Sequence, residues 1–282
     1  MPPLVPPAPA IRSLAMSIIL AAAAIAAAAS GEFKASKHPP IRPKYAIAYE
    51  TRDMRDARKR VVELLLTDVP LDVAAAVAEL DPHMEAVNQD ALRDRNYIVV
   101  VVRPDGSASM NATYSERMLQ FVDTTGMSLK AELTTNTPDR VEGRLFSPKK
   151  VETSDESWTV DVHFAADVTR APAGTKLAAG GGAPGKALQA LMTAVAKKNW
   201  AGIKAAVPPD KYDGVDEAVS MLENWLPKKN AKITGGELRG DTAILDVEGE
   251  VFEGMKGLMR VRMKKSGEQW LFDRSVRAGF LN

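Results

Sequence analysis

The chain has 282 residues, of which 45% are hydrophobic and 26% charged, an ordinary balance for a folded globular protein with room for two domains. Its 37 basic and 36 acidic residues give a formal net charge of +1, which argues against a protein that grips polyanions. Cysteine is absent, so thiolate nucleophiles, disulfides, cysteine-based zinc sites and a lipidated cysteine anchor are excluded.

The first thirty residues are typical of a secretory signal peptide. Arg12 is their one charged residue, and an alanine-rich apolar stretch follows it over 13–30. Small residues at positions 27 and 29, or 28 and 30, suit signal-peptidase cleavage. An uncleaved membrane anchor and a cytosolic helix are the alternatives, but the stretch is short and mostly alanine for a membrane span. We therefore predict export to the periplasm or beyond, with a tethered form if the segment is not cleaved.

Glycine and proline mark the boundaries between the remaining parts. The segment APAGTKLAAGGGAPGKA, which starts at residue 171, contains three consecutive glycines and one large apolar residue. Such a composition packs poorly and predicts a flexible linker over 171–185. A Pro-rich tether over 31–44, a domain over 45–170 and a second domain over 186–282 complete the division. Residues 31–170 carry 19 bases and 23 acids, and residues 171–282 carry 17 and 13. The weakly opposite charges of the two halves favour their docking, but salt screens this attraction and keeps it small.

The N-terminal domain is predicted to be mainly β. YIVVVV, from Tyr97, and the alternating WTVDVHFAADV predict strands, and LDVAAAVAELD predicts a helix entered from Asp72. Residues 53–66 fit either a helix or a strand. Several short strands with regular turns favour a β-sandwich-like domain. Asp81, His83 and Glu85 offer metal-binding atoms, but with a single histidine a helix-capping turn is the favoured interpretation.

The C-terminal domain begins with three amphipathic helices. In KALQALMTAVAKKNW apolar residues recur at i, i+3, i+4 and i+7, and AGIKAAVPPD contains a second, short helix that ends before Pro208. The third, VDEAVSMLENWL, has Asp213 as its expected N-cap and Pro227 directly after it.

From residue 241 the apolar period changes to two, which indicates antiparallel strands. Ala243, Leu245 and Val247 alternate with acidic neighbours, and on the next strand apolar residues alternate with Arg260 and Arg262. Opposite charges on the same side of neighbouring strands pair across the ladder. We therefore predict a solvated sheet face here, rather than a patch that binds nucleic acid.

The helices around AVAKKNWAGIKAAV, the strand GDTAILDVEG and the closing VRMKKSGEQWLFD resemble a nuclear-transport-factor-2-like (cystatin-like cone) domain over residues 184–282. This resemblance implies three helices on a curved four-stranded antiparallel sheet, with an apolar cavity between them. The predicted fold class is thus α+β, a sandwich-like domain followed by a cone-shaped one. The resemblance gives five candidate cavity-lining residues, for which ordinary core packing is the alternative: Met221, Trp225, Met259, Trp270 and Phe272.

Catalytic members of that family place Asp, Tyr or His inside the cone. This domain has no histidine, and its one tyrosine, Tyr212, lies near Asp210 and Asp213 in a loop. A Tyr/Asp proton-transfer pair is therefore the enzymatic alternative, whereas a helix cap is the ordinary role of such an aspartate.

The sequence contains no serine elbow, phosphate loop, dinucleotide fingerprint or paired-histidine helix. We expect an exported, non-catalytic binding or accessory protein that uses no metal or cofactor, does not bind nucleic acid and has no membrane span in its mature form. Its partner would be a small apolar ligand or an envelope protein, bound by either domain or by the cleft between them. A homodimer through the open face of the C-terminal sheet is a further expectation.

Overall fold

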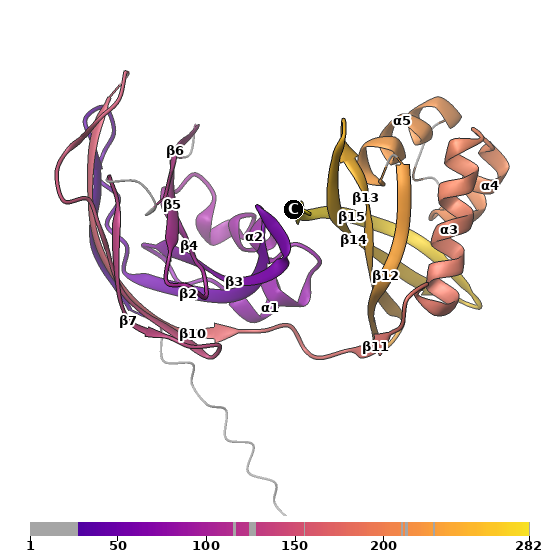
Figure 1. The fold of residues 1–282 in the computed structure, drawn as a ribbon, viewed down its shortest axis with the longest axis horizontal. Helices are drawn as coiled ribbons and strands as arrows, with labels where there is room; N and C mark the ends of the chain where they lie inside the picture. Colours follow the sequence, from indigo (N-terminus) through magenta and orange to yellow (C-terminus); the bar gives the residue numbers. More distant parts are fainter. Residues whose placement is uncertain are drawn as a thin grey trace, which may run out of the picture.

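The computed structural model describes residues 28–114, 117–123, 128–154, 156–209, 211, 214–227 and 229–281, with the backbone alone for 117–123. Residues 1–27 of the predicted export segment lie outside the described residues. Of the residues that the structure describes, 51% lie in strands and 20% in helices. Two halves lie side by side, residues 28–170 and 171–281, joined by one connection between β10 and β11 (Figure 1).

The N-terminal half is one curled sheet. Its described strands are β1 (Ala29–Ala35), β2 (Tyr45–Asp53), β3 (Asp56–Thr67), β4 (Tyr97–Val102), β5 (Ala108–Tyr114), β6 (Arg117–Asp123), β7 (Lys130–Asn136), β8 (Arg140–Phe146), β9 (Val151–Glu152) and β10 (Ser157–Thr169). They pair in the order β6-β5-β4-β3-β2-β10-β8-β7, with β1 and β9 also on β10. Residues 53–66, which fit a helix or a strand by sequence, belong almost entirely to β3.

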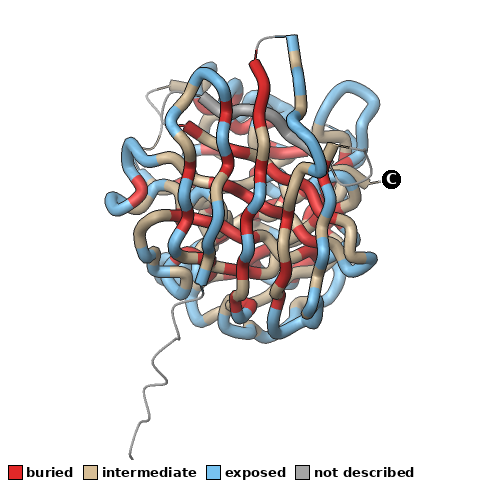
Figure 2. The backbone as a smooth tube through the Cα atoms, turned by 90° about the vertical axis from the view of Figure 1, so that its left-hand side faces the viewer, coloured by how far each residue is buried: buried red, intermediate tan, exposed pale blue. Residues whose placement is uncertain are grey.

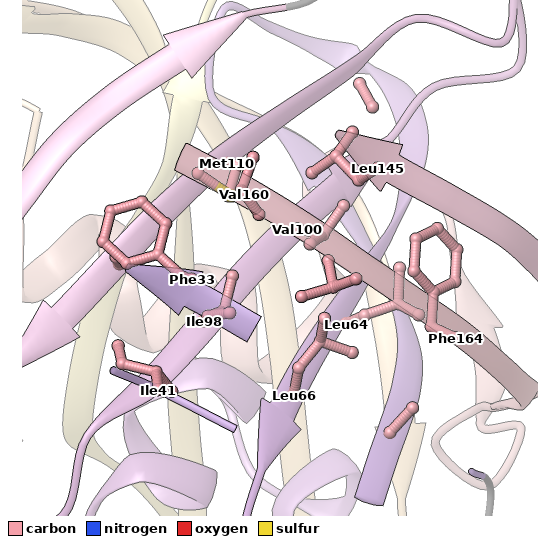
Figure 3. Close-up of a cluster of buried hydrophobic side chains, with 14 of the residues drawn as sticks. Phe33, Ile41, Leu64, Leu66, Ile98, Val100, Met110, Leu145, Val160 and Phe164 are labelled. Carbon is pink, nitrogen blue, oxygen red and sulfur yellow. The ribbon is translucent and has the colours of Figure 1, made fainter. Parts of the chain in front are cut away.

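Strand β10 makes the sheet continuous. It pairs antiparallel with β8 from Asp161 to Asp167, then parallel with β2 through Val168 and Thr169 alone. The two parts of the sheet therefore face each other around a single core (Figure 3). Phe33 stacks on Trp158 there, and Leu64 is fully buried among side chains from both parts. Burial of each large apolar side chain contributes about 1.5–3 kcal/mol.

The alternation predicted for WTVDVHFAADV is confirmed. Val160, Val162 and Phe164 are buried, whereas Asp161 and His163 are exposed on the outside of the sheet. Buried and exposed residues alternate along the strands of this outer surface (Figure 2).

Two short helices cover the outer face of β2, β3 and β4. They are α1 (Val73–Ala78) and α2 (Pro82–Val87), followed by the 3-10 helix η1 (Asp90–Leu92). Asp72 caps α1 by accepting from Ala75 N at 2.9 Å, and Asp81 caps α2 in the same way. Beneath the helices a second apolar cluster includes Tyr49, which is fully buried.

The C-terminal half places helices on one face of a sheet. Its helices are α3 (Gly182–Ala196), α4 (Trp200–Ala206) and α5 (Val215–Trp225). Its strands are β11 (Thr175–Leu177), β12 (Lys229–Arg239), β13 (Thr242–Phe252), β14 (Met255–Ser266) and β15 (Gln269–Phe280), antiparallel in chain order. The apolar positions predicted for the strands, among them Leu245, Val247 and Val261, are buried against the helices.

The other face of this sheet is turned toward the N-terminal half (Figure 1). Glu79 at the end of α1 contacts Arg262 and lies 2.8 Å from Arg274, and Arg52 of β2 lies 2.8 Å from Asp246. The side chains of Arg262 and Arg260 are only 13% and 23% exposed. The prediction of a solvated face is therefore wrong. Alternation separated the apolar side from the ionic side, but it gave no sign that a second domain covers the ionic side.

The predicted fold class is also wrong. The described residues are mostly β rather than α+β, and they form neither a sandwich of separate sheets nor a three-helix cone. A parallel pairing of only two residue pairs joins the N-terminal strands into one sheet, and a pairing that short has no sequence signature. In the C-terminal half β11 adds a fifth strand, and the interior between helices and sheet is filled by side chains such as Phe272 and Met263.

Two segments predicted to be irregular contain strands. The Pro-rich tether over 31–44 includes most of β1, which pairs with β10 from Ala29↔Phe164 to Ala35↔Trp158. The linker over 171–185 includes β11 and the start of α3. In both places the neighbouring strand supplies hydrogen bonds that the local composition does not reveal.

Candidate functional site

A pocket of about 380 Å³ lies between the two halves. Its floor is the outer face of β2 to β5, α2 forms one side, and β14 and β15 of the C-terminal half form the opposite wall. The lining mixes apolar and ionisable side chains, among them Arg52, Asp53, Glu63, Leu80, His83, Met84, Val99, Val101, Arg103, Ser109, Arg260 and Arg277.

Strand register brings polar residues together on the floor. Tyr49 lies opposite Glu63, Glu63 opposite Val101, and Val101 opposite Ser109, across four neighbouring strands. Residues opposite one another on a sheet share a face, so these side chains form one row. These residues are too far apart in the sequence to form a local motif.

Glu63 is the centre of a hydrogen-bonded network. The Tyr49 hydroxyl donates to Glu63 Oε1, and His83 Nδ1 of α2 lies 2.7 Å from the same oxygen. The Glu63 side chain is 13% exposed, so this contact is partly shielded from water.

The network shifts the pKa values of both partners of Glu63. Burial and the nearby Glu63 carboxylate hold the pKa of Tyr49 well above its usual range. Burial lowers the pKa of His83, but the hydrogen bond and the negative charge of Glu63 outweigh it, so the His83 pKa is raised. With Nδ1 directed at Glu63, the other ring nitrogen, Nε2, is the one available to the pocket.

A buried ion pair fixes the floor beside this network. Arg103 Nε donates to Asp53 Oδ2 at 2.8 Å, and the two side chains are 11% and 6% exposed. Arg103 Nη2 also lies 3.5 Å from the hydroxyl of Ser109. The pair holds a guanidinium and a hydroxyl in fixed positions under the pocket.

The C-terminal wall brings a second arginine toward Arg52. Arg52 Nη2 donates to Asp246 Oδ2 at 2.8 Å, and Arg260 Nε lies 3.9 Å from the other oxygen of Asp246. Burial lowers the pKa of Arg52 and of Arg260, and repulsion between neighbouring guanidinium groups lowers both further. Arginines from opposite halves thus share the Asp246 carboxylate where the halves meet.

The five predicted cavity-lining residues lie elsewhere. Met259 and Phe272 are buried in the core between helices and sheet, and Trp225 and Trp270 pack against that core. Met221 is 36% exposed on α5. A pocket of about 490 Å³ between α3 and α5 is lined by neighbours such as Met192 and Leu222, and by none of the five.

The alternative catalytic residues Asp210, Tyr212 and Asp213 lie outside the described residues. Asp81 has the capping role favoured by the sequence, and His83 pairs with Glu63 rather than with Glu85. In the described part of the chain, no three His, Asp or Glu side chains gather as they would around a metal ion. No local sequence motif marks Glu63, Tyr49 and Arg103 as site residues, because only strand register brings them together.

Of the helices in the described ranges, none has both the length and the apolar character needed to cross a membrane. In comparisons with known proteins, no family model, curated protein or solved structure matches the chain.

Proposed function

We propose that this chain is an exported, non-catalytic binding protein that holds a small molecule in the pocket between its two halves. The observation that carries the proposal is a pocket lined from both halves, with polar groups already held in place by their neighbours. Sites for small molecules are typically concave, largely preformed and commonly found at domain interfaces.

The size and lining of the pocket favour a small ligand. Its volume of about 380 Å³ lies toward the lower end of the range for small-molecule sites. Val99 and Val101 offer an apolar surface, whereas Ser109 and His83 offer hydrogen bonds. A few oriented polar groups in an apolar setting give specificity, because a ligand that leaves them unpaired binds less tightly.

The test is a thermal-shift screen of neutral, cationic and anionic small molecules, followed by calorimetry on each hit. A ligand that binds only the folded chain raises its melting temperature. Val101→Trp fills the pocket from its floor and should abolish binding. Ala196→Trp, which fills the separate pocket between α3 and α5, is the matched control and should leave binding unchanged. A screen without hits, or binding lost only in the control variant, contradicts the proposal.

A further inference from the structure

We infer that the ligand of the pocket between the halves is a small amphipathic anion, with one carboxylate or phosphate group and an apolar body. This inference rests on the proposed function and specifies its ligand class. It follows from the charge balance of the lining and from the position of its apolar surface.

Positive charge exceeds negative charge in the lining. Six arginines and His83 line the pocket, against four acidic residues. The acids already have partners: Asp53 lies 2.8 Å from Arg103, and Glu63 lies 2.7 Å from His83. A further acidic ligand group would therefore meet cations rather than compete with uncompensated carboxylates.

The excess of positive over negative charge is clearest around Arg260. This arginine shares Asp246 with Arg52, and it shares Glu237, 3.2 Å away, with Arg239. Three guanidinium groups thus depend on two carboxylates. Arg260 Nε is buried without a hydrogen bond in the described structure, and such a group carries an unrelieved desolvation cost. The pKa values of Arg52 and Arg260 are both lowered, chiefly by burial, which agrees with a desolvation cost at this position.

Arg277 adds an exposed cation to the lining of the pocket. It is exposed on β15 and lines the pocket, and among the described residues no carboxylate lies within 4.0 Å of it. Its guanidinium lies over the ring of Phe280, 5.1 Å from the ring centre. An anion can therefore bind Arg277 without breaking an ion pair.

The apolar side of the pocket accounts for the body of the ligand. Val99 and Val101 lie on the floor, and Leu80 and Met84 come from the region of α2. Met84 is 46% exposed, so part of its apolar surface is open to a ligand. Contact with an alkyl or aromatic body would bury this surface, at about 25 cal/mol for each Å² removed from water.

The test uses four probes with the same hexyl-length chain: hexanoate, hexyl phosphate, hexanol and hexylamine. Each is titrated calorimetrically into the full chain at low salt. We expect one or both anions to bind, the alcohol to bind at least about tenfold more weakly, and the amine not to bind. The stronger of the two anions identifies the acidic group as carboxylate or phosphate.

Two variants and a control locate the acidic group. Arg277→Gln should weaken anion binding about threefold to fivefold, as expected for an exposed pair, and leave hexanol binding unchanged. Arg260→Gln should weaken it by about tenfold or more. Arg42→Gln removes an exposed charge paired with Glu32 on β1, outside the pocket, and should change nothing. Since Arg260 is paired with Glu237 and Asp246 inside the C-terminal sheet, its loss can disturb that sheet, and the Arg277 variant keeps the test valid if the Arg260 variant fails to fold.

The outcomes separate this inference from the proposed function. If hexanol or hexylamine binds as tightly as the anions, and Val101→Trp abolishes that binding, the pocket is a ligand site but the anion inference is wrong. Equal loss of anion binding in Arg277→Gln and Arg42→Gln also overturns the inference. If the screen and all four probes fail to bind, both proposals fall.

Discussion

Glu63 is the residue on which the polar part of the pocket depends. A single carboxylate oxygen accepts from Tyr49 and lies 2.7 Å from His83, and both partners have raised pKa values. A carboxyl group that is only 13% exposed needs such partners, because burial of a polar group without hydrogen bonds is costly. The same contact joins β3 to α2, so it also holds the helix over the floor of the pocket.

Replacement of Glu63 by Gln should lower the pKa of His83. The charge and the hydrogen bond that raise this pKa would be lost or weakened, whereas the burial that lowers it would remain. Proton NMR titration of the imidazole signals measures the shift. The chain has three histidines, so His38 and His163 serve as internal controls. A His83 pKa that does not change would show that Glu63 is not its partner in solution.

The raised pKa of His83 also sets the sign of a pH effect on stability. Its contribution to the free energy of unfolding is present below the ordinary value of 6.5 and is lost as pH rises through the higher folded value. Because the His83 side chain is 36% exposed, the effect should stay below about 1 kcal/mol. Melting temperatures above pH 6.5 should therefore fall less in His83→Gln than in the parent protein. Parallel curves would contradict this assignment.

At the scale of elements, period and capping predict local structure well. Asp72 and the apolar stripe after it predict α1, YIVVVV predicts β4, and a period of two predicts β13 and β14. What periodicity cannot predict is the partner of each face. The ionic side of β13 and β14 has the sequence pattern of a solvent-exposed surface. It is nevertheless covered by the N-terminal half, whose Glu79 and Arg52 pair with Arg262 and Asp246.

The candidate site could not be predicted from the sequence, because its contacts also join distant parts of the chain. His83 and Glu63 are 20 residues apart, and Arg52 and Asp246 are 194 apart. The first contact needs the register of β2 and β3 and the position of α2, and the second needs the docking of the halves. His83 between Asp81 and Glu85 indicated a metal site only weakly. Its partner in the structure is Glu63, which is neither of these two acids.

The end of β15 makes a close contact that only glycine permits. Phe280 N donates to Met54 O at 3.0 Å, in the turn between β2 and β3. A Cβ atom on Gly279, whose φ is +146°, would lie 2.6 Å from Asp53 O and 3.1 Å from Met54 Cα. The strand therefore approaches the turn this closely because position 279 has no side chain.

Gly279→Ala should loosen the contact between the halves and destabilise the protein by about 1–3 kcal/mol. Chemical denaturation measures the stability, and limited proteolysis between β10 and β11 reports the separation. Gly214→Ala is a matched glycine change with open space around it and should cost less than about 1 kcal/mol. Equal effects of the two substitutions would mean that the close approach of β15 has no role in docking.

At the scale of the whole molecule, ion pairs of both polarities join the halves. Arg52 of the N-terminal half pairs with Asp246, whereas Arg274 of the C-terminal half pairs with Glu79 and with Glu85 at 2.7 Å. The opposite net charges of the halves, noted in the sequence, are thus accompanied by specific contacts. Because these ion pairs need ionised carboxylates, acid should weaken the contact between the halves.

Acidification should separate the halves. Burial alone would raise the pKa of Glu79, but hydrogen bonds and positive charge from Arg262 and Arg274 outweigh it and lower this pKa. A depressed carboxylate pKa stabilises the docked state above the ordinary value of 4.5 for Glu79. This stabilisation is lost as pH falls further, through the folded value. Small-angle scattering should therefore show the radius of gyration increasing below about pH 4, while circular dichroism still reports folded halves.

The variant Arg274→Gln tests which contact controls this transition. Removing Arg274 leaves Glu79 with Arg262 alone, so the pKa of Glu79 should be less depressed and separation should begin at a higher pH. Arg42→Gln, which breaks only the exposed pair with Glu32, should leave the midpoint unchanged. If the halves stay together at pH 3, or the midpoint does not move in Arg274→Gln, the ion pairs do not hold the joint. Apolar contact and the close approach at Gly279 would then have to account for the docking of the halves.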